Sequence, residues 1–401
     1  MNKTFLNLGY QPLANNFQSK KQNSFYSLNL KFNNKNKLVS ISKRVKKEIM
    51  FNKTYPYRSS LSVSVKNHFK DLSKIIKKNF PHKKILEIGS NDGTFAKNFR
   101  KSQIVCVEPC FDVGNILKKK GFKVHIKYFD DELVKLLSKN SNKFDLIFSA
   151  NTITHISNIK KVLNNIKKIL SYNGVFILEE PSFLECYKKN AFDQFYNEHI
   201  YVLSAIALKN ILTKIGLKIF KIENLEIHGG SLRYYITHKK NNNYKKCQSL
   251  KKQIKIETKT GLDKFTTYKK FAKNIFNLKK KLIKIFKEIK SKKGKIVGYG
   301  ASAKSVTVVN YCNLKENFFD YFIDTTTTKI GRYLPGTKIR VRKYSKSILD
   351  EKVFYFLGAW NFKDEIFLKE KDLLKKGGSF ILHLPMPHIY KKIKKIKKQK
   401  Y

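Results

Sequence analysis

The segment AFDQFYNEHIYVLS, residues 191–204, places tyrosine, asparagine, glutamate and histidine side chains between aromatic and aliphatic residues. Burying polar side chains costs free energy unless each one finds a hydrogen-bonding partner. One interpretation is therefore a surface loop anchored by its aromatic residues. The other is a proton-transfer site, because imidazole can take up or release a proton near neutral pH. The elements around the segment have to decide between these two interpretations.

A glycine-containing turn follows the strand expected in KKILEI, and its sequence EIGSNDG contains Glu87, Gly89 and Gly93. Glycine permits a positive φ and lets a ligand approach the backbone, and the next helix offers free N–H groups. Dinucleotide folds prefer G-x-G-x-x-G, which seats a pyrophosphate, whereas the spacing here is G-x-x-x-G. Asn91 and Asp92 line this turn. An acidic turn suits a cationic sulfonium better than a diphosphate, because like charges repel.

Glu108 ends the next expected strand, in QIVCVEP. A carboxylate there can accept hydrogen bonds from both hydroxyls of a ribose, and an ordinary surface glutamate is the alternative. The interval from the glycine turn to Glu108 is one strand–helix–strand passage. Together the two features predict S-adenosylmethionine as the cofactor.

Strands and helices alternate from residue 84 onward. FDLIFSAN and GVFILEE are expected strands, and ISNIKKVLNNIKKIL has apolar residues at helical spacing. This alternation predicts an α/β fold with a parallel sheet covered on both faces. The basic residues 241–290 are expected to form a loop and a long connecting helix.

A second α/β unit is expected from residue 291. KIVGYGASAKSVTVVNYC predicts a strand, a glycine turn and a helix, and three more strands follow in YFIDTT, VFYFLGAWN and SFILHLP. Ser302 and Lys304 stand near the start of that helix, where phosphate oxygens can bind. The turn either holds the phosphate-bearing part of a substrate or is only a structural repeat of the first.

The chain carries 84 Lys and Arg against 29 Asp and Glu, a formal net charge of +55. Such a charge would ordinarily suggest a nucleic-acid or anionic-membrane partner. The lysines are scattered along nearly the whole chain, and the abundant Asn, Ile, Phe and Tyr share A/T-rich codons with Lys. Drift in base composition explains this pattern at least as well as selection for a polyanionic partner, so no nucleic-acid partner is expected. No apolar segment approaches the ~20 residues that span a bilayer.

The five cysteines form no C-x-x-C pair, which fits reduced thiols in a cytoplasmic protein. Nothing in the sequence fixes the oligomeric state.

Nine segments occur in one order along almost the whole chain. They are LNLGYQPLANNF, LEIGSNDGTF, VEP, NTITHI, FDQFYNEHIY, IHGGSLRYY, GYGASAKSVTVVNYC, FIDTTTTKIGRYLPGTKI and GAWNFKDEI. In the sequence and order of these segments, the chain resembles the sugar C-methyltransferases that act on nucleotide-linked deoxy-keto-sugars. The resemblance implies a small irregular N-terminal domain of zinc type at 1–58 and a Rossmann-like class I methyltransferase domain at 59–240. A linker at 241–290 and a Rossmann-like C-terminal domain at 291–401 would follow.

The resemblance also implies roles for individual residues. His199 becomes the base, and Tyr196, Glu198 and His155 surround the reacting sugar carbons. The expected cofactor residues are Glu87, Gly89, Ser90, Asn91, Asp92, Gly93, Glu108 and Asn151. The expected substrate residues are Tyr57, His228, Gly229, Arg233 and Lys304. Two alternatives stay open, because His155 can be a core histidine and the segment HGGSLR can merely shape a turn.

The sequence departs from the family at the zinc domain. No cysteine precedes Cys106, and Asn33 and Asn36 stand where a second C-x-x-C pair would fall. Amides do not replace thiolates on zinc. We therefore expect no metal and an N-terminal segment held by packing alone. The family also usually has histidine where Asn197 stands, which affects fine geometry more than the reaction.

Two other functions are compatible with parts of the sequence. A methyltransferase acting on RNA or another small molecule would keep the cofactor and change the acceptor. A non-catalytic nucleotide-binding protein would keep the fold, although Tyr196, Glu198 and His199 together weigh against it. Dehydrogenase activity is disfavoured by the spacing of the first glycine turn.

Overall fold

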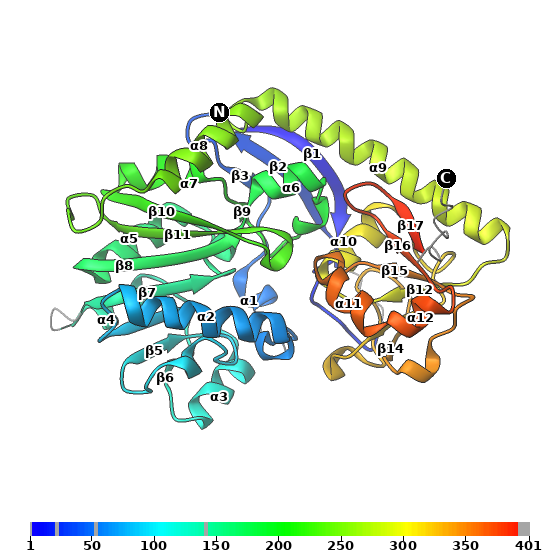
Figure 1. The fold of residues 1–401 in the computed structure, drawn as a ribbon, viewed down its shortest axis with the longest axis horizontal. Coiled ribbons are helices and arrows are strands. Elements are labelled where there is room, and N and C mark those ends of the chain that lie inside the picture. Colours follow the sequence, from blue (N-terminus) through cyan, green and yellow to red (C-terminus); the bar gives the residue numbers. More distant parts are fainter. Residues whose placement is uncertain (1, 21–23, 52–54, 140–142, 392–401) are drawn as a thin grey trace, which may run out of the picture. The chain divides into compact units, whose positions relative to one another are not determined.

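A computed structural model describes residues 2–20, 24–51, 55–139 and 143–391 (Figure 1). The chain divides into two compact units. The first unit comprises Met1–Asn7, Asn29–Cys186 and Asn197–Lys269, and the second comprises Leu8–Leu28, Tyr187–Tyr196 and Lys270–Tyr401. This division does not test the domain boundaries inferred from the sequence, and those boundaries remain predictions.

The core of the first unit is a seven-stranded sheet with the order β10-β11-β8-β7-β4-β5-β6. Five neighbouring strands, β8 to β6 in this order, run parallel, and β11 is antiparallel to both β8 and β10. The predicted parallel sheet is confirmed, with one antiparallel strand added near its edge. The strands are β4 (Ile85–Ile88), β5 (Ile104–Val107), β6 (Lys123–His125), β7 (Phe144–Ala150), β8 (Leu170–Pro181), β10 (Leu217–Leu225) and β11 (Ser231–His238).

Apolar faces of helices cover this sheet. Every residue of β4 and β5 is buried, as expected for parallel strands covered on both faces. Helix α2 begins after its N-cap Ser62, and its buried residues Phe69 and Leu72 belong to the same core cluster as Phe148. The helices are α2 (Val63–Asn79), α3 (Phe111–Lys119), α4 (Asp131–Leu137), α5 (Ile159–Ile169), α6 (Phe183–Lys189) and α7 (Ala205–Lys214).

Two helices, α8 (Gln248–Thr260) and α9 (Phe265–Ser291), stand where the sequence predicted a loop and one long helix. Gly261 ends α8 in a left-handed conformation with φ 80°, which glycine adopts without strain. Across the described ranges, no helix combines the length and the apolar character that crossing a membrane requires.

The second unit contains a six-stranded sheet with the order β14-β13-β12-β15-β16-β17, in which only β17 is antiparallel to its neighbour. The four strands predicted here from the sequence are confirmed as β12, β13, β15 and β16. The elements are β12 (Ile296–Tyr299), α10 (Ala303–Tyr311), β13 (Tyr321–Asp324), β14 (Val341–Lys343), β15 (Phe354–Leu357), α11 (Lys363–Lys369), α12 (Lys371–Lys375), β16 (Ser379–Leu382) and β17 (His388–Lys391).

Short 3-10 helices connect several of these elements. They are η1 (Ser59–Leu61), η2 (Ala96–Asn98), η4 (Ile153–His155), η5 (Phe192–Gln194), η6 (Ile227–Gly229), η7 (Thr327–Lys329), η8 (Lys346–Ile348) and η9 (Trp360–Phe362).

The N-terminal segment forms a four-stranded sheet, where the sequence suggested an irregular domain. Its order is β1-β2-β3-β9, from β1 (Asn2–Gln11), β2 (Tyr26–Asn33), β3 (Val39–Ile41) and β9 (Tyr201–Val202), and the short helix α1 (Lys47–Met50) follows. Strand β9 lies directly after His199 and pairs antiparallel with β3. The polar segment that holds His199 is therefore fixed to a sheet by main-chain hydrogen bonds.

Hydrogen bonds of Asn33 close the turn between β2 and β3. Its Oδ1 accepts from the N–H groups of Lys35 and Asn36, both at 3.0 Å, and Asn36 Oδ1 accepts from the N–H of Leu38 at 3.2 Å. The expectation that packing alone holds this segment is thus incomplete. Within the described ranges, no group of His, Cys, Asp and Glu residues is placed to hold a metal ion.

We expect the stability of the protein to be insensitive to a metal chelator and sensitive to Asn33. Asn33→Ala should lower the free energy of unfolding by about 1 kcal/mol, because two main-chain N–H groups lose their acceptor. Urea unfolding with and without EDTA measures both effects. Asn34→Ala is the matched control, since Asn34 Oδ1 accepts from the exposed ammonium of Lys37 and, among the described residues, from no main-chain N–H group. A chelator that lowers the unfolding midpoint would contradict this account.

Candidate active site

A cavity of about 590 Å³ opens in the first unit at the carboxyl ends of β4, β5 and β7. Ligands of open α/β sheets bind at this edge, and the volume is typical of a small-molecule site. Three stretches contribute much of its wall. They are 87–91 after β4, 107–110 at the end of β5, and 150–152 with 155–158 after β7.

The turn after β4 accepts only glycine at Gly89. Its φ is +79°, and a Cβ atom there would lie 2.0 Å from Thr152 Oγ1. Gly93 has φ +84°, and a Cβ atom there would lie 2.3 Å from a methyl group of Leu117. The N–H of Gly89 donates to the carbonyl of Val107 at 2.8 Å, which ties the turn to β5. Gly89 and Thr152 both line the cavity, and the absence of a side chain at Gly89 allows Thr152 to pack against it.

Glu108 faces the same cavity from the end of β5. Its Oε2 accepts from the N–H of Asn91 at 2.8 Å, and its Oε1 accepts from the N–H of Cys110 at 2.9 Å. Burial raises the pKa of Glu108, and these two bonds oppose the shift. Each carboxylate oxygen has a second lone pair, so both can still accept from ligand hydroxyls.

Glu87 contributes a second buried carboxyl group to the wall. Burial raises its pKa well above the usual value, and the charges of Glu108 and Asp92 raise it further. Its Oε2 is buried and has no hydrogen-bond partner among the residues that the structure describes. An unpaired buried acceptor in a cavity wall suits a cationic donor on a ligand.

Asp92 does not line the cavity, although the sequence placed it at the cofactor. Its carboxylate accepts from the hydroxyls of Ser59 at 2.8 Å, Thr94 at 2.9 Å and Ser60. Burial acts to raise the pKa of Asp92, but the hydrogen bonds from Ser60, Ser59 and Thr94 lower it below the usual value. Asp92 thus ties η1 to the glycine turn, and its role toward a cofactor stays a prediction.

The remaining residues predicted for the cofactor are Ser90, Asn91 and Asn151, and all three line the cavity. Ser90 Oγ donates to the carbonyl of Glu87 at 3.1 Å. Asn91 and Asn151 have φ values of 49° and 50°, a left-handed conformation that asparagine tolerates better than most residues. Asn91 Oδ1 accepts from the N–H of Ser59 at 2.8 Å.

Three rings stack beside the cavity. The ring of His155, in η4, lies between Phe51 at 5.6 Å and His199 at 5.0 Å, measured between ring centroids. His155 lines the cavity, whereas His199 is buried, is not among the lining residues and reaches the cavity wall through its stack on His155. Burial lowers the pKa of His155 to about 4, so its imidazole is neutral at neutral pH. Its Nε2 is shielded from solvent and has no partner within the described part of the chain.

A buried glutamate that the sequence reasoning missed holds the turn of His155. Glu180 Oε1 accepts from the N–H groups of Thr152 and Thr154, both at 3.2 Å, and its Oε2 accepts from the hydroxyl of Thr154 at 2.8 Å. Burial raises the pKa of Glu180 to about 7, against the opposing effect of these bonds. The available signal was the pair of glutamates that ends the apolar run GVFILEE.

Tyr55 is a second residue that the sequence reasoning missed. It lines the cavity, and its hydroxyl donates to Glu198 Oε2 at 3.0 Å. The signal was its position beside Tyr57 in YPYRSS. The structure thus brings Glu198, His199 and His155 to the first unit, whereas Tyr196 belongs to the second unit. The catalytic roles of all four stay predictions.

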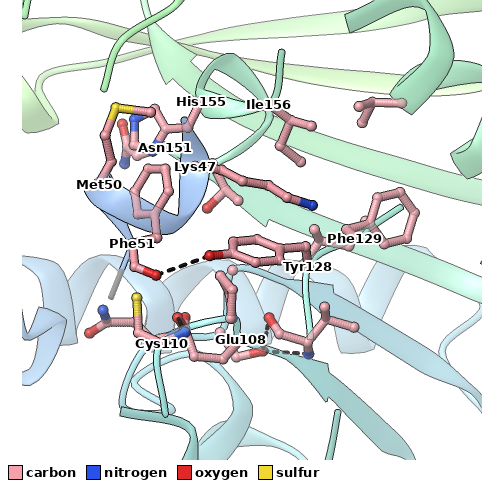
Figure 2. Close-up of a pocket in the computed structure, with 18 of the residues that line it drawn as sticks. Lys47, Met50, Phe51, Glu108, Cys110, Tyr128, Phe129, Asn151, His155 and Ile156 are labelled. Carbon is pink, nitrogen blue, oxygen red and sulfur yellow. Dashed lines mark hydrogen bonds between the residues drawn. The ribbon is translucent and has the colours of Figure 1, made fainter. Parts of the chain in front are cut away.

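An aromatic wall closes the side of the cavity next to β6. Figure 2 shows the hydroxyl of Tyr128 pointing at the carbonyl of Phe51, a hydrogen bond of 3.2 Å. The ammonium of Lys47 lies 4.0 Å from the centroid of the Tyr128 ring. A flat aromatic surface of this kind can pack against a purine ring. With the two carboxyl groups and the glycine turn, the cavity has the size and the hydrogen-bonding groups that suit S-adenosylmethionine.

The residues predicted for the substrate fall in different places. Tyr57 and His228 line the cavity, and Gly229 follows His228 in η6. Arg233 is buried on β11, where its guanidinium donates to Glu179 and, at 2.8 Å, to Glu223 Oε2. This buried ion pair favours the alternative that the segment shapes the protein. A substrate contact for Arg233 stays a prediction.

Lys304 lies in the second unit, in the first turn of α10. The glycine turn before it repeats the geometry of the first unit. The N–H of Gly300 donates to the carbonyl of Ile323 at 2.9 Å, and the N–H of Ala301 donates to Asp324 Oδ2 at 2.8 Å. The structural repeat is thus present, and the binding of a phosphate group there stays a prediction.

The fold and the site define the class of the protein. A parallel sheet with one antiparallel strand at β11, a glycine turn after β4 and an acidic residue at the end of β5 are the features of a class I methyltransferase. Its cofactor is S-adenosylmethionine. Residues 64–222 match the family model of a methyltransferase domain, and residues 226–385 match that of a C-methyltransferase C-terminal domain.

Relatives agree with this assignment. The chain is 25% identical to C-methyltransferase NovU of Streptomyces niveus over 307 residues. This alignment covers 76% of this chain and 73% of that protein. It is 28% identical over 158 residues to the uncharacterized protein MJ1123 of Methanocaldococcus jannaschii, covering 38% of this chain and 73% of that protein. The two matching domain models, in this order, identify the protein as an S-adenosylmethionine-dependent C-methyltransferase.

Solved structures of methyltransferases show a weaker likeness. An S-adenosylmethionine-dependent methyltransferase of Clostridium acetobutylicum has a TM-score of 0.33 at 14% identity, covering 43% of this chain and 91% of that one. A methyltransferase solved in complex with the Trm112 methyltransferase activator of Haloferax volcanii has a TM-score of 0.35 at 11% identity. The match covers 44% of this chain and 95% of that one.

The low pKa of His155 predicts a pH-dependent loss of stability. Burial lowers this pKa from 6.5 to about 4, so in this pH range the unfolded chain binds a proton that the folded chain does not. The free energy of unfolding should therefore fall as the pH falls from 6.5 to 4. His155→Asn should remove this part of the fall, measured by urea unfolding at pH 7 and pH 5. An unchanged difference between the two pH values in the variant would contradict the prediction.

Proposed function

We propose that the protein transfers a methyl group from S-adenosylmethionine to the carbon next to a ketone in a nucleotide-linked deoxysugar. The observation that carries this proposal is the stack of His199 on His155 at the wall of the cavity that also contains Gly89 and Glu108. Carbon methylation requires a base beside the cofactor turn, and His199 stacks on a residue of the cavity wall. The sugar acceptor is supported by the nine sequence segments and by the C-methyltransferase C-terminal domain.

The residues around the glycine turn would hold the cofactor. The backbone at Gly89 admits its amino-acid part, Glu108 is placed to accept from ribose hydroxyls, and Glu87 offers an unpaired oxygen to a cationic group. When bound, S-adenosylmethionine supplies a methyl group on a positively charged sulfur, so that a C–C bond replaces a C–S bond. The carboxyl groups favour this cationic cofactor over a diphosphate.

The histidines would perform the proton transfer. A carbon next to a ketone is a poor nucleophile until its proton is removed, and the imidazole of His199 takes that proton. Negative charge then develops on the ketone oxygen. A neutral His155 with its proton on Nε2 can donate to that oxygen, because burial disfavours the imidazolium form. Tyr196 is the second donor that the sequence suggests.

Glu198 and Tyr55 would keep the segment of His199 in place. The hydrogen bond from the hydroxyl of Tyr55 to Glu198 Oε2 joins the cavity wall to the residue next to His199. Strand β9 fixes the other side of His199 through its pairing with β3. Positioning of this kind supplies a large part of the acceleration in enzymes.

Two measurements test this proposal. Calorimetry with S-adenosylhomocysteine measures binding at the cavity. Mass spectrometry of nucleotide-linked keto-sugars, incubated with the protein and S-adenosylmethionine, should then show a product heavier by one methyl group on carbon. Cofactor binding with methylation of RNA, and of no sugar, would assign the acceptor to nucleic acid. Binding without methylation of either would indicate a non-catalytic relative.

A further inference from the structure

The turn at residues 152–155, which contains η4, contributes to two parts of the cavity wall. Thr152 lines the cavity beside the glycine turn, where the missing side chain of Gly89 leaves room for it. His155 lines the cavity further along the same turn and stacks on His199. A shift of this turn would therefore change the surroundings of the cofactor and the position of the histidines together.

The start of η4 lacks the local cap that several helices of this unit have. Within the described part of the chain, the side chain of Thr152, the N-cap of η4, makes no capping hydrogen bond. Its Oγ1 donates instead to the carbonyl of Ala150 at 3.0 Å. The helices α2, α4, α5 and α7 are each capped by the side chain of their own N-cap residue. The first N–H groups of η4 therefore need an acceptor from another element.

Glu180, near the end of the neighbouring strand β8, supplies that acceptor. Its Oε1 accepts from the N–H groups of Thr152 and Thr154, both at 3.2 Å, and its Oε2 accepts from the hydroxyl of Thr154 at 2.8 Å. The N–H of Asn151 donates to the main-chain carbonyl of Glu179, the preceding residue of β8, at 2.9 Å. A row of hydrogen bonds thus attaches the whole turn to the end of β8.

An acceptor on a neighbouring strand does more than a local cap. A local N-cap stabilises a helix wherever that helix lies. Glu180 instead has a fixed place in the core, because the preceding residue of β8 pairs with Ala150 of β7 in the parallel sheet. Glu180 is fully buried, and burying a carboxyl group is costly, which is why its pKa rises to about 7. What this group adds is a defined position of η4 relative to the sheet.

We propose that Glu180 is a positioning residue for methyl transfer, which fixes residues 152–155 so that Thr152 packs on the cofactor turn and His155 lines the cavity. Glu180 is not among the residues that line the cavity, so it acts through the turn and not by touching a ligand. The inference rests on the proposed function for the part of His155 in the reaction. Its effect on the cofactor turn follows from the contact between Thr152 and Gly89 alone.

Two substitutions separate the position of this group from its charge. Glu180→Asp keeps the carboxyl group but withdraws it by one methylene group, so that η4 must shift or lose its acceptor. It should lower kcat by about 10- to 100-fold, the cost of misplacing a group near the reaction. Glu180→Gln removes the charge and keeps a carbonyl oxygen at full reach for the N–H groups of Thr152 and Thr154. It should retain most of the wild-type kcat.

The affinity for S-adenosylhomocysteine, measured by calorimetry, is a second readout that needs no sugar substrate. A shift of η4 should reach the cofactor turn, because Thr152 packs on Gly89. Glu180→Asp should weaken this affinity by about 2- to 10-fold, the worth of one hydrogen bond. Glu180→Gln should bind S-adenosylhomocysteine like the wild type.

Asn241→Leu is the matched control for lost stability. Asn241 is fully buried near the other end of β8, where its Nδ2 donates to the carbonyl of Tyr172 at 3.1 Å and its Oδ1 accepts from the N–H of Asn243 at 2.9 Å. It is not among the residues that line the cavity. Its melting temperature should fall, while the cofactor affinity and the kcat of the folded protein stay at the wild-type values.

The outcomes that contradict the positioning role are distinct from those that contradict the proposed function. A rate that falls in Glu180→Gln and not in Glu180→Asp would assign the role to charge and overturn the inference. Wild-type kcat and affinity in Glu180→Asp, or losses that only follow the folded fraction, would also overturn it. A wild-type protein that methylates no sugar nucleotide would overturn the proposed function alone. The affinities of the two Glu180 variants for S-adenosylhomocysteine would still decide the positioning role.

Discussion

His199→Ala is expected to lower kcat for methyl transfer by about 10²- to 10⁴-fold, the usual worth of a general base. The affinity for the cofactor should not change, because His199 is not among the residues that line the cavity and contacts it through His155. Single-turnover methyl transfer followed by mass spectrometry measures the first quantity. Calorimetry with S-adenosylhomocysteine measures the second.

His238→Ala is the matched control for this variant. His238 also lies in the first unit and stacks on an aromatic ring, that of Tyr172 at 6.1 Å, but it is not among the residues that line the active-site cavity. Its substitution should leave both turnover and cofactor affinity near the wild-type values. Normal turnover in His199→Ala would remove His199 from the reaction. A parallel loss of cofactor affinity would show that the substitution acts through the cavity wall instead.

The sequence predicts the centre of each sheet well and its edges poorly. Buried parallel strands are short continuous apolar runs, and β4, β5, β12 and β16 are recognisable for that reason. The short edge strands carry no such signal. β6 has three residues and none of them is buried, so its sequence KVH does not differ from that of a loop.

Pairing between distant segments is the part of the fold that local patterns cannot give. Strand β9 is only the two residues Tyr201 and Val202, and it becomes a strand because β3 lies beside it. The resemblance to the family implied an irregular N-terminal domain. The segment instead forms a sheet in which β3 pairs antiparallel with both β2 and β9, without the cysteine pairs of that family.

The site shows the same limit. Gly89, Asn91 and Glu108 were predicted from one turn and one strand end, and all three line the cavity. Tyr55 and Glu180 were missed because their partners, Glu198 and Thr154, lie far away in the sequence. The side-chain direction of Asp92 could not be foreseen either. It depends on the hydroxyls of Ser59 and Ser60, which only the fold brings near.

The charges of the site explain how one cavity can serve both cofactor and proton transfer. Glu87 and Glu108 stand at the glycine turn, where burial raises the pKa of both carboxyl groups and a bound cation would favour their ionised form. His155 and His199 both follow Thr152 in the sequence. Burial lowers the pKa of His155 and so keeps its imidazole neutral. A neutral imidazole does not repel the cofactor, as an imidazolium would. The acidic groups and the histidines therefore support the same chemistry.

Gly89→Ala is expected to weaken binding of the cofactor by about 5- to 150-fold. The φ of +79° strains any side chain, and the new Cβ atom would meet Thr152 Oγ1 at 2.0 Å, so the turn or the segment of Thr152 has to move. Strain and displacement of this kind cost about 1–3 kcal/mol, and each 1.4 kcal/mol is tenfold in affinity. Calorimetric titration with S-adenosylhomocysteine measures the change.

Gly331→Ala separates the effect of the clash from that of backbone strain. Gly331 has φ +77°, and a Cβ atom there would have nothing within 4 Å. This variant should lose stability through strain alone and bind the cofactor like the wild type. If Gly89→Ala also binds S-adenosylhomocysteine with wild-type affinity, the turn after β4 is not where the amino-acid part of the cofactor lies. The close approach between that turn and Thr152 would then only shape the fold.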